Sequence, residues 1–152
     1  MKIGIVDTTF SRVNMGDIAI DELKNYAGIR YIRRTVPGIK DLPVEAKRLL
    51  EEGCDIVITL GWVGKTEKDA LSYLAMSIGK IMAELMTNKH IIDVTVHEDE
   101  AEDEKTLLRV AENRVREHVR NAVDLTRNPE RLIKQAGTGQ RQGFEDVGPI
   151  LR

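Results

Sequence analysis

The fold is decided by residues 56–96, which read IVITLGWVGKTEKDALSYLAMSIGKIMAELMTNKHIIDVTV. Two short runs rich in isoleucine and valine, Ile56–Leu60 and Ile91–Val96, enclose a segment whose apolar residues recur every three or four positions. The runs are typical of buried strands, and the spacing over Asp69–Met86 predicts a helix. Strand, helix and strand in this order predict a right-handed crossover between parallel strands.

The same alternation continues on both sides of this unit. Ile3–Val6 and Tyr31–Val36 are two further apolar runs, so four parallel strands are expected. A helix should begin at Pro43 and stop at Gly53, and a later amphipathic helix should end at Asn128-Pro129. The sequence therefore predicts a single α/β domain over residues 1–152, built on a doubly wound parallel sheet.

Composition narrows the class of protein. The formal net charge is -2, with acidic and basic residues mixed along the chain, which argues against a nucleic-acid binder. Cys54 is the single cysteine, so an internal disulfide and a cysteine-based metal cluster are excluded. Apolar runs stay well short of the roughly 20 residues of a membrane helix, and Met1–Gly4 leave no room for a signal peptide. These features predict a cytoplasmic protein.

The candidate site lies where the strands end, because ligands of open α/β sheets bind beyond the carboxyl ends of the strands. The segments that follow the expected strands are residues 7–10, 36–41, 61–65 and 97–99. The candidate binding residues in them are Thr9, Phe10, Val36, Pro37, Gly38, Ile39, Gly61, Trp62, Gly64 and Lys65. A flat heteroaromatic ligand could stack on Phe10 or Trp62 while backbone N–H groups meet its carbonyl oxygens.

A purely structural interpretation stands beside each of these features. Phe10 and Trp62 could anchor loops onto the core, and Pro37-Gly38 is a turn signal in any protein. Residues 65–69 could be a solvated helix start, where the helix dipole favours acidic residues. The acidic run from His97 to Glu104 could likewise open the later helix.

Several motifs together resemble the archaeal riboflavin synthases. They are IGIVDTTFSRVNM (3–15), TVPGIKDLP (35–43), Gly64-Lys65 with Glu67-Lys68-Asp69, LMTNKHII (85–92) and GQRQGFED (139–146). A more distant resemblance, to lumazine synthases, implies a flavodoxin-like three-layer α-β-α sandwich. The implied activity is the last step of riboflavin biosynthesis. In it, two 6,7-dimethyl-8-ribityllumazine molecules give riboflavin and 5-amino-6-ribitylamino-2,4-pyrimidinedione.

The chain departs from the lumazine synthases in the third segment. That family carries a catalytic histidine in the loop and helix start after strand three, whereas this chain has no histidine between Gly61 and Lys89. Residues 66–69 also replace the glycine-threonine pair that the family uses for phosphate. The chain is therefore not expected to condense a phosphorylated sugar, and a second lumazine would occupy that region.

The implied reaction needs two rings placed face to face and loss of a proton from a C7 methyl group. His97, Glu67, Asp69 and Glu98 are unranked candidates for moving that proton. Lys65 or Lys68 could stabilise the carbanion. No organic cofactor is expected, and the acidic run is compatible with Mg²⁺.

The resemblance also implies a homopentamer with its sites between adjacent subunits. The polar, glycine-rich segment 135–152, which alone would be interpreted as a flexible terminus, could then contact a neighbouring subunit. Two other functions stay open: a lumazine synthase, and a non-catalytic flavin or lumazine carrier on the same fold. A phosphoacceptor domain is disfavoured, because the third strand ends in Thr59-Leu60-Gly61 without the required aspartate.

Overall fold

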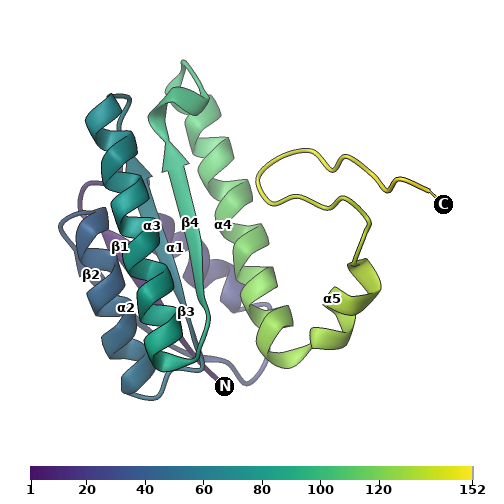
Figure 1. The fold of residues 1–152 in the computed structure, drawn as a ribbon. Coiled ribbons are helices and arrows are strands. Elements are labelled where there is room, and N and C mark those ends of the chain that lie inside the picture. The colour runs from purple at the N-terminus through teal and green to yellow at the C-terminus, as the bar shows by residue number, and fades with distance from the viewer. Residues whose placement is uncertain (152) are drawn as a thin grey trace.

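The structure, a computed structural model, describes residues 1–151 and alternates strands with helices (Figure 1). The strands are β1 (Lys2–Thr8), β2 (Arg30–Val36), β3 (Ile56–Val63) and β4 (Ile91–His97). The α-helices are α1 (Met15–Leu23), α2 (Leu42–Glu51), α3 (Glu67–Thr87), α4 (Glu104–Arg127) and α5 (Pro129–Gln135). Short 3₁₀ turns, η1 (Ile39–Asp41) and η2 (Glu98–Glu100), follow β2 and β4.

The strands pair in the order β2-β1-β3-β4, and each neighbouring pair is parallel. Helices α1 and α4 pack on one face of this sheet, and α2 and α3 pack on the other (Figure 1). The predicted three-layer α-β-α sandwich is therefore confirmed. The chain runs outward from β1 to β2 and then returns to β3 on the other side of β1. The crossovers consequently diverge at the carboxyl ends of β1 and β3, which is where such folds place ligands.

The third strand is longer than the sequence predicted. Its predicted end at Leu60 was wrong, because residues 61–63 pair in register with residues 95–97 of β4. Trp62 therefore belongs to a strand rather than to a loop, and it is only 2% exposed. The last strand likewise extends to His97, which was placed in the following loop.

Two helices were absent from the sequence prediction. In α1, the side chain of Asn14 caps the first turn by accepting a hydrogen bond from the backbone N–H of Asp17, at 3.2 Å. The late helix α4 does end before Pro129, as predicted, but Pro129 then occupies the first turn of the short helix α5. Proline thus stops one helix and starts the next.

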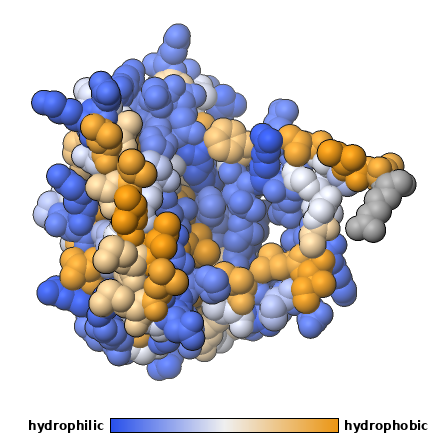
Figure 2. Space-filling model, viewed as in Figure 1, coloured by the Kyte–Doolittle hydropathy of each residue, from blue (hydrophilic) through white to orange (hydrophobic). Residues whose placement is uncertain are grey.

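The apolar stripe of α3 faces outward rather than into the core. Met76 and Ala83 are the buried residues of this helix within residues 1–151. The exposed stripe of α3 consists of Leu71, Leu74, Ile78, Ile81, Met82, Leu85 and Met86. Figure 2 shows it as a column of hydrophobic surface running along α3. Monomeric proteins rarely expose a continuous apolar surface of this kind.

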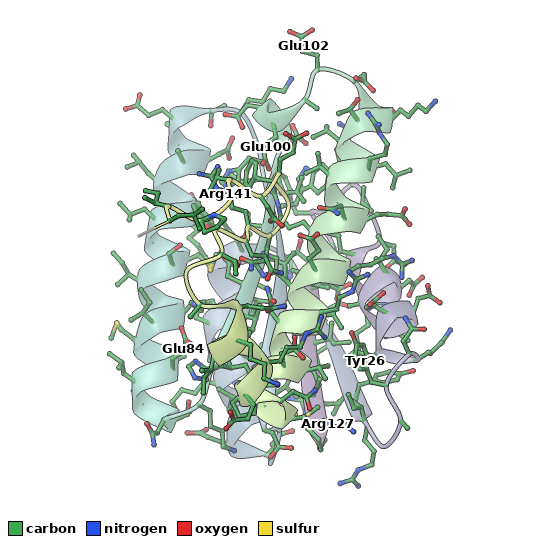
Figure 3. The ribbon with its side chains drawn as sticks, turned by 90° about the vertical axis from the view of Figure 1, so that its right-hand side faces the viewer. Tyr26, Glu84, Glu100, Glu102, Arg127 and Arg141 are labelled. Atoms are coloured by element: carbon green, nitrogen blue, oxygen red, sulfur yellow. The ribbon has the colours of Figure 1, made fainter. Side chains whose placement is uncertain are left out.

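The segment after α5 lacks regular secondary structure but folds back against α4 (Figure 1, Figure 3). Its backbone turns on itself through a hydrogen bond from the N–H of Val147 to the carbonyl of Gly139, at 3.1 Å. The N–H of Gly143 donates to Glu117 of α4 at 2.9 Å, and Phe144 lies 5.0 Å from the Arg114 guanidinium. Within residues 1–151, no helix has both the length and the apolar character needed to cross a membrane.

Candidate functional site

A cavity of about 320 Å³ opens at the carboxyl ends of β1, β2 and β3. This strand-end cavity is lined by Phe10, Gly38, Ile39, Lys40, Asp41, Trp62, Val63, Gly64, Asp69 and Ser72. The Phe10 ring is 55% exposed, so its face is free for a ligand. The volume lies at the lower end of the range of small-molecule pockets, roughly 300–1,000 Å³.

Backbone contacts join the loops that form this cavity. The N–H of Thr9 donates to the carbonyl of Val36 at 2.9 Å, and the Thr9 hydroxyl donates to the carbonyl of Pro37 at 3.2 Å. The loop that bears Phe10 is therefore tied to the Pro37-Gly38 turn. Gly61 lies beneath these loops, where a Cβ atom would come within 3.2 Å of Ile39. The shape of the cavity is set largely by main chain.

Trp62 fixes one wall of the cavity. Its indole N–H donates to a carboxylate oxygen of Glu98 at 2.8 Å, which links the end of β3 to the turn after β4. Arg12, from the loop after β1, lies 4.0 Å from the same carboxylate and also pairs with Glu104. Because Trp62 is only 2% exposed, it forms a wall of the cavity, and Phe10 is the aromatic ring that is accessible for stacking.

The start of α3 forms another wall and is held by a capping box. The Asp69 N–H donates to the Thr66 hydroxyl at 3.2 Å, while the Thr66 hydroxyl and N–H both donate to the Asp69 carboxylate. These hydrogen bonds from Thr66 lower the pKa of Asp69 below its usual value. Both of these bonds go to the same carboxylate oxygen of Asp69, and a carboxylate with a lowered pKa is a weak proton acceptor.

A second cavity, of about 260 Å³, opens beside the edge strand β4, between α3 and α4. This β4-edge cavity is lined by Tyr73, Asp93, Thr95, His97, Glu100, Arg114, His118, Gln142 and Phe144. The Tyr73 hydroxyl donates to Asp93 at 2.9 Å, and the Thr95 hydroxyl donates to the other oxygen of that carboxylate at 2.8 Å. The rings of Tyr73 and His97 meet edge to face at 4.8 Å.

An arginine forms the floor of the β4-edge cavity. Arg114 donates two hydrogen bonds of 2.6 Å to Glu100 and one of 2.8 Å to the carbonyl of Thr95. Burial acts to raise the pKa of Glu100, but the hydrogen bonds from Arg114 and from the His97 N–H outweigh it and lower that pKa. Figure 3 views this side of the molecule, where the segment after α5 passes between α3 and α4 below Glu100.

Burial shifts the pKa values of two other side chains of this cavity. It lowers the pKa of His118, which favours the neutral imidazole. Burial and the negative charge of Asp93 raise the pKa of Tyr73 to about 12, so the phenol stays a hydrogen-bond donor. The cavity therefore presents neutral and paired polar groups.

The candidate residues from the sequence do not all lie in one cavity of the structure. Those that line the strand-end cavity are Phe10, Gly38, Ile39, Trp62, Gly64 and Asp69. The main chain that supports this cavity contains four others, Thr9, Val36, Pro37 and Gly61. His97 lies on the β4-edge cavity, and Glu98 is bonded to Trp62. Lys65, Glu67 and Lys68 are exposed at the start of α3.

Sequence reasoning missed lining residues of both cavities. In the strand-end cavity they are Lys40, Asp41 and Val63, which lie within the expected segments but were not among the candidates, and Ser72, which lies one helical turn after Asp69. In the β4-edge cavity they are Tyr73, Asp93, Thr95, Arg114 and His118. Asp93 and Thr95 alternate with apolar residues along β4, which places both on one face of the sheet.

Four of the carboxylates of the acidic run already have protein partners. Glu98 accepts from Trp62, Glu100 accepts from Arg114, Asp103 caps α4 and Glu104 pairs with Arg12. Among residues 1–151, no three His, Cys, Asp or Glu side chains gather in a way that could hold a metal ion.

The cavity lies at the point where a doubly wound sheet reverses direction, which is where α/β proteins of this class bind small molecules, and it carries one exposed aromatic ring. The family model of 6,7-dimethyl-8-ribityllumazine synthase matches residues 1–130. The chain is 74% identical to a riboflavin synthase of Archaeoglobus fulgidus over 100% of both chains. It is 56% identical to a riboflavin synthase of Aeropyrum pernix over 97% of each.

A lumazine synthase of Methanococcus aeolicus is 40% identical over 77 residues, which are 47% of this chain and 57% of that protein. The chain therefore belongs to the 6,7-dimethyl-8-ribityllumazine synthase family and, within it, to the archaeal riboflavin synthases.

Proposed function

We propose that this chain is a transferase that converts two molecules of 6,7-dimethyl-8-ribityllumazine into riboflavin and 5-amino-6-ribitylamino-2,4-pyrimidinedione. The observation that carries the proposal is the 74% identity to a riboflavin synthase over the full length of both chains. The strand-end cavity supports it, because the exposed Phe10 ring and the surrounding backbone suit a flat, hydrogen-bonding ring system.

The chemistry requires little from protein nucleophiles. Two lumazines held face to face exchange a four-carbon unit, and fixing them together can contribute roughly 7–11 kcal/mol by making an encounter effectively intramolecular. One subunit offers a strand-end cavity of about 320 Å³, a size suited to a single ring system. The second lumazine therefore requires surface from elsewhere, which favours a site shared between subunits.

We propose a homopentamer with these shared sites, and the exposed stripe of α3 supports an assembly of this kind. Ile78 lies within the stripe and is 53% exposed, so Ile78→Glu should reduce the molar mass measured by sedimentation without unfolding the subunit. The segment after Gly137 is proposed to contact a neighbour's site. Its deletion should lower activity more than stability, and equal activity per folded subunit would contradict that role.

Among the candidates for proton transfer, the arrangement favours His97. Asp69 and Glu98 already accept hydrogen bonds, and Glu67 is exposed. His97 lines the β4-edge cavity, which a shared site would bring to the strand-end cavity of a neighbour. His97→Gln should then lower kcat while leaving riboflavin affinity nearly unchanged, whereas an equal loss of both would assign His97 to binding.

The deciding experiment is incubation of the purified chain with 6,7-dimethyl-8-ribityllumazine alone, with and without Mg²⁺, while riboflavin is followed by its absorbance. Riboflavin and the pyrimidinedione should form in equal amounts, and a rate that depends on Mg²⁺ would support a metal ion in the site. Turnover of the pyrimidinedione with the butanone phosphate, and none of lumazine, would instead identify a lumazine synthase. Tight riboflavin binding without turnover would identify a carrier.

A further inference from the structure

The loop between β1 and α1 carries Phe10, the exposed ring of the strand-end cavity. The loop starts after the buried Asp7 and Thr8 of β1 and ends at Asn14, the residue that caps α1. A ring that is 55% exposed is not held by packing alone, so its position depends on the backbone that bears it. What fixes the two ends of this loop therefore decides where a stacked ligand would lie.

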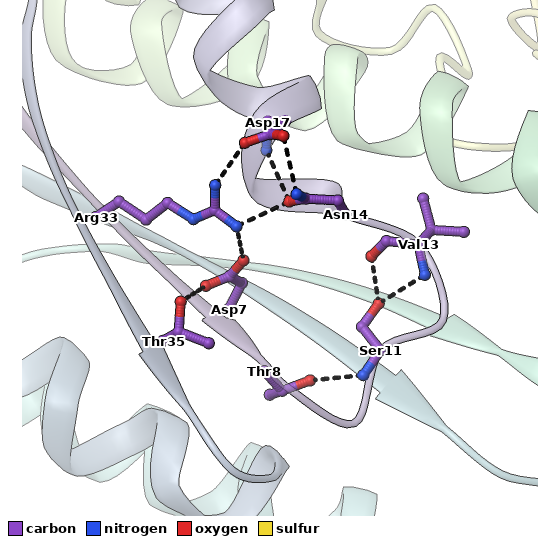
Figure 4. Close-up of polar contacts among 8 residues, drawn as sticks. All are labelled: Asp7, Thr8, Ser11, Val13, Asn14, Asp17, Arg33 and Thr35. Carbon is purple, nitrogen blue, oxygen red and sulfur yellow. Dashed lines mark hydrogen bonds and ion pairs between the residues drawn. The ribbon is translucent and has the colours of Figure 1, made fainter.

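One guanidinium group bonds both ends of this loop. Arg33, on the neighbouring strand β2, donates to Asp7 at 2.5 Å and to the side-chain oxygen of Asn14 at 2.8 Å (Figure 4). Its other terminal nitrogen donates to Asp17, in the first turn of α1, at 2.6 Å. The end of β1 and the start of α1 are thus tied to one side chain.

The contact with Asp7 is built to hold its geometry. The Asp7 side chain is 6% exposed, and its second oxygen accepts a hydrogen bond from the Thr35 hydroxyl at 2.6 Å (Figure 4). Hydrogen bonds between charged groups are shorter and stronger than those between neutral groups. Asp7 therefore fixes one side of the Arg33 guanidinium group, and Asn14 and Asp17 accept hydrogen bonds from it on the other side.

Gly16 makes room for this arrangement. A Cβ atom at Gly16, the second residue of α1, would overlap the guanidinium group of Arg33. The side chain of Arg33 can lie against the first turn of α1 only because this position has no side chain. The glycine thus explains how an arginine from β2 reaches the loop ends.

We propose that Arg33 is a positioning residue, which sets the Phe10 ring for stacking by bonding both ends of the loop that carries it. The consequence for turnover rests on the proposed function, whereas the consequence for the loop does not. Arg33 acts through Phe10, so its loss should matter only where Phe10 matters. The ring would otherwise sample positions that do not stack on a bound lumazine.

Arg34, the next residue of β2, is a matched control. It points to the other face of the sheet, where it pairs with Glu45 at 2.7 Å and with Glu52 at 2.6 Å. Both carboxylates belong to α2 or its end, away from the Phe10 loop. Arg34→Met removes an arginine with two ion pairs from the same strand, so it reproduces the general loss of charge pairing.

The first measurement is hydrogen exchange of the amides of residues 8–16. Arg33→Met should speed exchange of these amides, whereas Arg34→Met should leave them unchanged. Gly16→Ala is a second variant that keeps every charge but displaces the guanidinium. It should speed exchange in the same loop although alanine favours a helix more than glycine does. Arg33→Lys, which cannot bond both ends in the same way, should restore the loop only in part.

The second measurement is a double-mutant cycle on kcat/KM. Arg33→Met should lower kcat/KM roughly 10- to 100-fold, as a small misplacement of a binding group does. In a chain that already carries Phe10→Ala, the same substitution should cost little more, because coupled residues do not act additively. Arg34→Met should lower kcat/KM in both backgrounds only as far as it lowers the fraction of folded chain.

Two results would overturn the proposal. One is a full, additive effect of Arg33→Met in the Phe10→Ala background, and the other is equal exchange of residues 8–16 in Arg33→Met and Arg34→Met. If the unaltered chain fails to turn over lumazine, the proposed function fails, and hydrogen exchange alone decides whether Arg33 holds the loop. If Arg33→Met does not fold, Gly16→Ala carries the same comparison.

Discussion

The two cavities of this molecule meet at α3, where the consecutive residues Ser72 and Tyr73 line one cavity each, yet they are built from different contacts. The strand-end cavity is shaped by main chain, glycines and rings. The β4-edge cavity is shaped by charged and titratable side chains that bond one another. Each contains one of the two phenylalanines, Phe10 in the first and Phe144 in the second.

This difference separates an aromatic ring that can contact a ligand from a charge pair that stabilises the fold. In the strand-end cavity the exposed ring can be removed without disturbing the core, so damage there should appear in turnover. In the β4-edge cavity the buried pair of Arg114 and Glu100 holds the fold, so damage to that pair should appear in stability. Substitutions of Phe10 and of Arg114 should therefore give opposite patterns of stability and activity.

The largest expected effect is the loss of Arg114, whose side chain is 7% exposed. Arg114→Met leaves Glu100 without its charge partner and Thr95 without a donor to its carbonyl. Breaking a buried ion pair from one side costs about 3–5 kcal/mol, and we expect the lower end because Glu100 is partly exposed. Urea unfolding measures this loss directly.

Arg116→Met, on the same helix, is the control for Arg114→Met. Arg116 pairs with Asp21 and Glu22 but is 31% exposed, and Arg120 also bonds Glu22, so its removal leaves that carboxylate paired. We expect a loss of about 1 kcal/mol or less. Equal losses at both positions would show that the β4-edge cavity does not depend on its arginine.

The next effect is on turnover. Phe10→Ala should change the free energy of unfolding by less than about 0.5 kcal/mol, because the side chain is mostly exposed. It should lower kcat/KM roughly 10- to 100-fold if the ring places the substrate. Phe10→Trp keeps an aromatic face and should retain most activity. A loss of stability in Phe10→Ala as large as the loss of activity would remove the contrast between the two cavities.

The sequence was sufficient for much of the fold, because its signals are local. Short runs that contain isoleucine and valine marked the four strands, and Pro43 and Pro129 marked helix boundaries close to those observed. Trp62 was misplaced because Gly61 suggested that the strand had ended. Pairing with β4 extends the strand past that glycine, and this pairing is long-range.

The same reason explains what could be found of the site. Phe10 and the Pro37-Gly38 turn follow strands directly, so a rule about strand ends was enough to find them. The β4-edge cavity joins Tyr73, Asp93 and Arg114, which are far apart in sequence and meet only after the helices pack. Arg33 gave no signal either, since its partners come from β1 and α1.

A smaller effect is expected from the hydrogen bond between Tyr73 and Asp93. Tyr73→Phe removes one of two hydroxyl donors to that carboxylate, and Thr95 keeps the other, so we expect a loss of about 1 kcal/mol. Among the chain's three tyrosines, the one that ionises near pH 12 should disappear from the tyrosinate absorbance titration. Loss of tyrosinate absorbance near the ordinary tyrosine pKa of about 10 instead would contradict this placement of the phenol.

The smallest effect is the pH dependence contributed by His118. Burial lowers its pKa in the folded chain, while the nearby Asp93 and Glu117 act to raise it and Arg114 acts to lower it. Below the ordinary histidine pKa of about 6.5 the unfolded chain therefore binds a proton that the folded chain does not. Stability from this group is complete above that pH and is lost as the pH falls toward the folded value.

One such proton changes stability by at most about 1.4 kcal/mol per pH unit. His118→Gln removes the titrating group, so its free energy of unfolding should fall less between pH 7 and about pH 5 than that of the unaltered chain. The comparison is needed because carboxylates with lowered pKa, such as Glu100, also lose stability on acidification in both proteins. Parallel curves would mean that water reaches His118, and the β4-edge cavity would then be wetter than its paired charges indicate.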